Sequence, residues 1–109
     1  MTEPVTQTTV TALLKQAGFA ERTWARQGRR APAPVEGFQT YDREDGSVLV
    51  CWIPATGQDP GNLEAFGRSY DMAEAYAAAA REAGWGAERW GVIWHYALIA
   101  AGPGESPAR

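Results

Sequence analysis

The residues best suited to binding chemistry lie in one basic segment near the amino terminus. Between Lys15 and Arg30 there are five cations and one anion, Glu21, so this segment has a formal charge of +4. The whole chain has a net charge of −3, and the remaining residues therefore sum to −7. An acidic protein that gathers half of its ten cations in one short segment is expected to present them to a ligand. The cations are Lys15, Arg22, Arg26, Arg29 and Arg30.

The sequence around these cations, residues 10–34, resembles the helix-turn-helix motif of DNA-binding proteins, and RQGRRAPAPV is similar to the end of this motif in excisionase-like proteins. The resemblance implies a turn at Gly18 and a second helix that enters the major groove. The buried positions that it implies are Leu13, Ala17 and Trp24. The exposed recognition face that it implies consists of Arg22, Thr23 and Arg26. The sequence departs from the family pattern at Leu14, where a small alanine is usual, and at Gln27, where a buried aliphatic residue is usual.

We therefore expect a DNA-binding accessory or regulatory protein. Arginine side chains bind phosphates and guanine edges through several donors at once. In the alternative interpretation, the arginines solvate one face and pair with acidic side chains such as Asp42 and Glu44, since charge runs on protein surfaces are common. The residues predicted to contact duplex DNA are Arg22, Thr23, Arg26, Arg29 and Arg30.

The aromatic residues suggest a second kind of function, a protein–protein interaction module. The chain has five tryptophans, and two of them, Trp85 and Trp90, flank the glycine-punctuated turn GWGAERWG. Exposed aromatic residues at such a turn can anchor a partner, whereas both would be structural if they pack beneath the loop. A module of this type can also bind a partner, or a second copy of itself, through a sheet edge near residues 38–43.

Catalysis and metal binding have little support in the sequence. Cys51 and His95 are the single cysteine and the single histidine, which excludes a disulfide and a cysteine- or histidine-based metal cluster within one chain. A Cys51–His95 dyad is conceivable if their strands are neighbours, but no oxyanion donor can be placed beside it. We expect no enzyme, no cofactor and no metal.

The compartment is expected to be the cytoplasm. A lone cysteine favours a reducing environment, and the start MTEPVTQTT lacks the features of a secretory signal. The longest apolar stretch, residues 92–101, is too short to span a bilayer. We therefore expect no membrane partner.

Three helices are predicted. Apolar residues at helical spacing indicate a first helix that begins at a cap, Thr8 or Thr9, and ends at Gly18. A second, short helix is expected from about Glu21 to Gln27. The main helix is expected from about Ser69 to Ala83, with small alanines that allow close approach to a sheet.

Three strands are predicted. Asp45-Gly46 is typical of a hairpin turn, and it separates an edge strand over 38–43 from a strand over 47–53 that is apolar on both faces. Alternating apolar residues predict one last strand over 88–100 that pairs with the second strand.

These elements predict an α+β fold in the order α-α-β-β-α-β. The simplest arrangement is a three-stranded, mainly antiparallel sheet with two to three helices packed on one face. We expect one domain over 9–101, a flexible amino terminus over 1–8 and a flexible carboxyl-terminal tail over 102–109.

Overall fold

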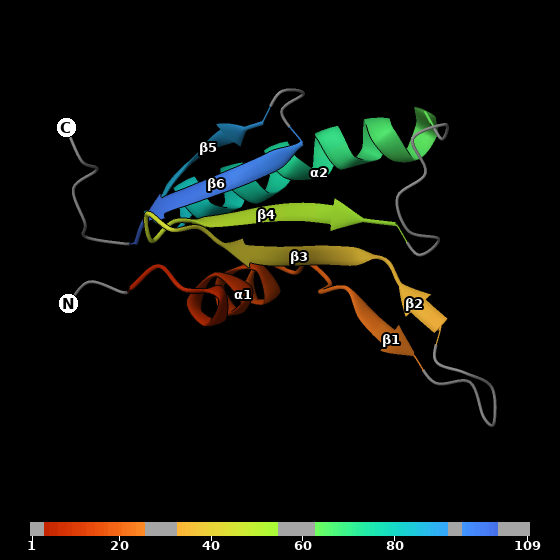
Figure 1. Cartoon of the computed structure of the whole chain (residues 1–109), viewed down its shortest axis with the longest axis horizontal. Helices are drawn as coiled ribbons and strands as arrows, with labels where there is room; N and C mark the ends of the chain where they lie inside the picture. Colours follow the sequence, from red (N-terminus) through yellow and green to blue (C-terminus); the bar gives the residue numbers. More distant parts are fainter. Residues whose placement is uncertain (1–3, 26–32, 55–62, 92–94, 103–109) are drawn as a thin grey trace.

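The computed structural model describes residues 4–25, 33–54, 63–91 and 95–102 (Figure 1). Its elements confirm the α+β class. In chain order they are α1 (Gln7–Gln16), β1 (Thr23–Ala25), β2 (Ala33–Val35), β3 (Gly37–Asp42), β4 (Val48–Ile53), α2 (Leu63–Glu82), β5 (Gly86–Trp90) and β6 (Tyr96–Ala101).

The main sheet has four antiparallel strands in the order β3-β4-β6-β5, and β1 and β2 form a separate two-stranded sheet. The prediction of three strands is therefore wrong. The expected last strand is two strands, β5 and β6, which pair with each other from Trp90↔Tyr96 onward. Gly91 follows β5 with a φ of +100°, a left-handed conformation in which the chain can turn. Apolar residues continue to alternate in the sequence after Gly91, so the sequence did not indicate that a strand ends at Trp90.

The predicted helix over 21–27 is also wrong over the residues that the structure describes. Thr23–Ala25 form β1, which pairs antiparallel with β2. Just before it, the Arg22 amide donates to the Phe38 carbonyl at 2.9 Å and the Phe38 amide donates to the Ala20 carbonyl at 3.0 Å. These backbone groups pair with β3 instead of with their own turn. Of the helix-turn-helix pattern, the described residues therefore retain the first helix and lack a helical start to the second.

Gly37 makes this close passage possible. A Cβ built on Gly37 would lie 2.5 Å from the Ala20 carbonyl oxygen and 2.5 Å from the Arg22 amide nitrogen. Such contacts are shorter than real Cβ atoms make, so a residue with a side chain would force the passing segment away. The position of residues 20–22, just before β1, thus depends on glycine, which has no side chain, at position 37.

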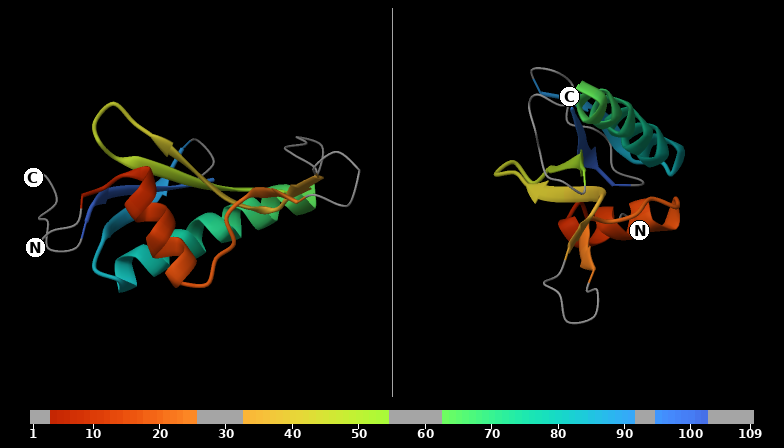
Figure 2. Two further views of the ribbon diagram at one scale, coloured as in Figure 1. Left: turned by 90° about the horizontal axis from the view of Figure 1, so that it is seen from below. Right: turned by 90° about the vertical axis from the view of Figure 1, so that its right-hand side faces the viewer.

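Both helices pack on one face of the main sheet (Figure 2). The first helix begins after the cap Thr6, whose hydroxyl accepts from the Thr9 amide, and buries Val10 and Leu14. In α2 the buried residues Tyr76, Ala77 and Ala80 meet the sheet, and the small alanines allow close approach. The sheet contributes Phe38, Val48, Val50, Trp52, Ala97 and Ile99 to this core.

The hairpin between β3 and β4 agrees with its prediction. Gly46 has a φ of +86° in the turn, and Asp45 accepts hydrogen bonds from the amide and the hydroxyl of Ser47. β3 lies at an edge of the sheet and β4 lies inside it. Over the described residues, neither helix has the length and apolar character needed to cross a membrane.

Candidate functional site

The strands β1 and β2 form a two-stranded arm, and the arginine-rich residues 26–30 lie between them in the sequence. Their register runs from Thr23↔Val35 to Ala25↔Ala33, so the chain leaves β1 and returns along β2. Figures 1 and 2 show this pair projecting from the end of β3, away from α2. We call residues 22–35 the basic arm, because four arginines and no acidic residue lie between positions 22 and 35.

The predicted DNA-contacting residues divide into two groups along this arm. Arg22 is half-buried at its base, and Thr23 is exposed at the start of β1. Arg26, Arg29 and Arg30 lie outside the described residues, in the sequence that connects the two paired strands. Arg22 and Thr23 therefore belong to the attachment of the arm, and the other three belong to its connection.

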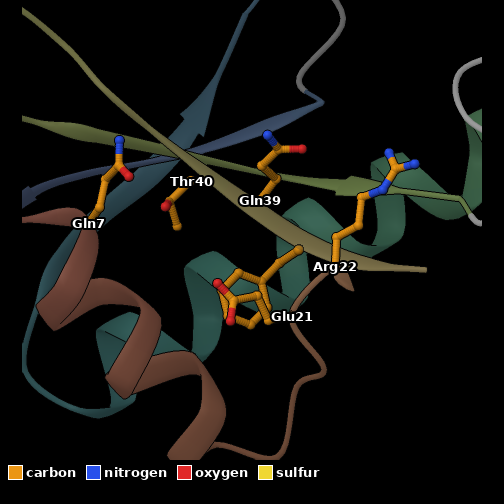
Figure 3. A pocket seen from close by; sticks show the side chains of 6 residues that line it. Gln7, Glu21, Arg22, Gln39 and Thr40 are labelled. Atoms are coloured by element: carbon orange, nitrogen blue, oxygen red, sulfur yellow. The ribbon is translucent and has the colours of Figure 1, made fainter. Parts of the chain in front are cut away.

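A hollow of about 440 Å³ lies between the base of the arm and α1, along the outer edge of β3 (Figure 3). Its lining is mainly polar, and Gln7 is at one end with Arg22 at the other. The described pairing on this edge is one isolated parallel bridge, Glu21↔Phe38, whereas β3 has six residues. The residues that line the hollow are Gln7, Glu21, Arg22, Phe38, Gln39 and Thr40.

The face of the main sheet opposite the helices has a different composition, and we call it the second face. In its clearest row, Tyr41 pairs with Leu49, Leu49 with Leu98 and Leu98 with Glu88 across four strands. Antiparallel partners point to the same side of a sheet, so this row alternates with the core row that contains Val48 and Ile99. The members of the second face are Gln39, Tyr41, Leu49, Cys51, Ile53, Glu88, Trp90, Tyr96 and Leu98.

Aromatic rings and arginines gather on the second face. Trp90 and Tyr96 form an edge-to-face pair with centroids 5.9 Å apart. The guanidinium of Arg43 lies 4.9 Å from the Trp90 ring centroid, although Arg43 follows β3 and Trp90 ends β5, on opposite edges of the sheet. The β3–β4 hairpin curves away from the helices (Figure 2), which brings Arg43 over this face. Tyr41 remains 39% exposed.

The second face also contains the single cysteine. Burial raises the pKa of the Cys51 thiol, and the hydrogen bond with Tyr41 and the charge of Arg22 oppose that shift. Burial and the neighbouring Cys51 raise the pKa of Tyr41, while Arg22 again acts in the opposite direction. The arginine at the base of the arm is therefore close enough to influence both groups. A raised pKa favours the neutral thiol of Cys51 over the thiolate.

His95 is the single histidine of the chain. It is half-buried, and its pKa is lowered by burial and by the charge of Arg89. Among the described residues, no three of the His, Cys, Asp and Glu side chains lie close enough together to hold a metal ion.

The two tryptophans predicted to bind a partner are in different environments. Trp85 is 5% exposed and belongs to the helix-side core, and its amide donates to the Ala80 carbonyl at 2.9 Å. The burial of Trp85 agrees with the alternative interpretation, in which its ring is structural. Trp90 is half-buried on the second face.

Sequence reasoning missed Tyr41, Arg43 and Tyr96 as candidate site residues. The alternation of side chains along residues 38–43 was sufficient to place Tyr41 and Phe38 on opposite faces of the sheet. The Asp45-Gly46 turn was sufficient to indicate the pairing of this strand with the next. Nothing local indicated which face the helices would cover.

Comparisons with protein-family models, with curated proteins and with solved structures found no match to this chain.

Proposed function

We propose that the protein is a small, non-catalytic DNA-binding accessory protein that contacts duplex DNA through the basic arm. The observation that supports the proposal is the antiparallel pairing of β1 with β2 into a projecting two-stranded ribbon, because Arg26, Arg29 and Arg30 belong to the sequence that joins these two strands. Two-stranded ribbons can enter a DNA groove, and arginines on such arms reach phosphates and the minor groove. The contact is a ribbon and not a recognition helix.

The charge distribution supports a local contact. The chain is acidic overall, so its surface as a whole repels DNA, and attraction must come from a segment such as the arm. Neutralising three or four phosphates predicts that affinity falls by roughly two orders of magnitude between about 50 and 200 mM salt.

The test is fluorescence anisotropy of a labelled random duplex at these two salt concentrations. We expect salt-sensitive binding by the natural protein and its loss in the Arg26→Glu/Arg29→Glu variant. The matched control is Arg68→Glu/Arg81→Glu, which makes the same charge change at two exposed positions of α2. Equal binding by the two variants would contradict the proposal, since net charge alone would then explain the effect.

A second candidate function, strand addition by a protein partner or a second copy, is favoured by the edge of β3. The Phe38 amide and carbonyl point outward to residues 20–22, and strand alternation directs those of Thr40 outward as well. Thr40→Pro removes one outward donor and is compatible with an edge strand. If strand addition forms a dimer, sedimentation should give a dimer for the natural protein and a monomer for Thr40→Pro.

A further inference from the structure

The second face combines an apolar floor with partly exposed rings. Cys51 is 3% exposed and Leu98 is 7% exposed, so they form the floor, while Tyr41 at 39% exposure stands at its edge. Trp90 and Tyr96 bound the floor on the other side through their edge-to-face contact. Neither helix packs against these residues. A surface of this kind offers the π-faces that nucleic-acid bases stack upon.

Two arginines lie beside these rings. Arg43 covers one face of the Trp90 ring, and the charge of Arg22 acts on Tyr41 from the base of the basic arm. Among the members of the second face named above, Glu88 on the edge strand β5 is an anion, and Arg43 is itself paired with the Asp45 carboxylate at 3.3 Å. Positive charge near Tyr41 and Trp90 complements a phosphate backbone that runs between them. Arg22 and Gln39, a member of the second face, both line the hollow at the base of the basic arm.

We propose that the second face binds the bases of single-stranded DNA, with Tyr41 as the principal stacking residue, Trp90 and Tyr96 as the far wall, and Arg43 and Arg22 as phosphate contacts. The inference rests on the proposed DNA-binding function. It adds single-stranded DNA as a ligand beside the duplex DNA bound by the basic arm. Four-stranded sheets that stack two or three bases on aromatic side chains are an established way of binding single strands. The sheet from β3 to β5 is roughly 14 Å wide at the usual strand spacing, enough for bases side by side.

The arrangement also predicts which bases are accepted. An aromatic ring can stack with any base. The Tyr41 hydroxyl and the Cys51 thiol form a hydrogen bond with each other, so they are less available to hydrogen-bond a particular base. Binding is therefore expected to be tolerant of sequence and dependent on the presence of bases.

The experiment compares two labelled oligonucleotides of about 12 nucleotides, an oligothymidine and an abasic strand of equal length, by fluorescence anisotropy. Both have the phosphates that the basic arm can bind, and only the first has bases. We expect the natural protein to bind oligothymidine more tightly by roughly tenfold or more, because each stacked base contributes a factor of this order.

Variants at two exposed tyrosines separate the faces. Tyr41→Ala should abolish the preference for oligothymidine, and Tyr41→Phe, which keeps the ring and loses the hydroxyl, should retain it. Tyr70→Ala is the matched control, since Tyr70 is 46% exposed on α2 and lies under Arg89 on the helix side. It should bind both oligonucleotides like the natural protein. Circular dichroism confirms that each variant is folded.

The outcomes distinguish the two proposals. Equal affinity for both oligonucleotides, or an unchanged preference in Tyr41→Ala, overturns the stacking inference even if the duplex is bound through the arm. A preference for oligothymidine in a natural protein that fails to bind duplex DNA, retained in Arg26→Glu/Arg29→Glu, supports the second face and overturns the proposed role of the basic arm. A stable dimer from which Tyr41→Ala releases monomers, with no base preference, assigns the second face to self-association and also overturns the inference.

Discussion

The two faces of the main sheet are built from the same strands but have different side chains and surroundings. On the helix side, Phe38, Val48 and Ile99 have no exposed surface, and α2 meets them with alanines. On the second face, Tyr41 keeps 39% of its surface and an arginine lies over Trp90. β4 has apolar residues on both sides, so its sequence does not show which side the helices cover. The packing of α1 and α2 determines that side. Fully buried residues on the helix side are therefore expected to contribute more to stability than the exposed Tyr41 on the second face.

The largest expected difference in stability is between variants at the two aromatic residues of β3, Phe38 and Tyr41. Phe38→Ala should lower the free energy of unfolding by about 3–5 kcal/mol, because a fully buried ring leaves a cavity. Tyr41→Ala should lower it by about 1 kcal/mol, because much of that ring already meets solvent. Urea denaturation of both variants measures the difference. Similar losses for the two would mean that the second face is also closed.

A smaller difference is expected between two glycines. Gly37→Ala should lower the free energy of unfolding by about 1–3 kcal/mol, because its Cβ would collide with the backbone of residues 20–22. Gly67→Ala should raise it by about 0.5–1 kcal/mol, because Gly67 is exposed in α2 and its Cβ would meet nothing within 4 Å. Thermal and urea unfolding test both signs. If Gly37→Ala left both stability and DNA binding unchanged, the close approach of residues 20–22 to Gly37 would be needed for neither.

The smallest effect concerns the turn that brings Arg43 over the second face. The hydrogen bonds from Ser47 hold the pKa of Asp45 below its usual 3.8, with a further contribution from Arg43. A depressed folded-state pKa stabilises the protein above the unfolded pKa, and that contribution is lost as the pH falls through the folded pKa. Unfolding measured between pH 7 and about pH 2 should therefore show a weaker acid dependence in Asp45→Asn. An identical dependence would remove Asp45 as a determinant of the turn.

Local signals in the sequence were sufficient for part of the fold and insufficient for the rest. Asp45-Gly46 predicted the β3–β4 hairpin, and helical spacing predicted α1 and α2, because these elements depend on neighbours in the chain. β1 was missed because its strand conformation depends on pairing with β2, from Thr23↔Val35 to Ala25↔Ala33, and not on neighbours in the sequence. The division at Gly91 was missed because apolar alternation continues on both sides of it.

The candidate site was less predictable than the fold. The cluster of arginines is visible in the composition, but the ribbon that carries it depends on pairing between β1 and β2. The aromatic members of the second face became recognisable only when the covered face was known. Trp85 illustrates the same difficulty, because a tryptophan after a glycine can either fill the core or remain exposed.

The strand order β3-β4-β6-β5 has a consequence for the way the chain folds. β3 pairs with β4, and β5 pairs with β6, so each pair joins neighbours in the sequence and forms with a small loss of chain entropy. The pairing of β4 with β6, from Val48↔Ile99 to Val50↔Ala97, is the contact that closes a long loop. We therefore expect two hairpins to form early and the β4–β6 junction to be made in the rate-limiting step.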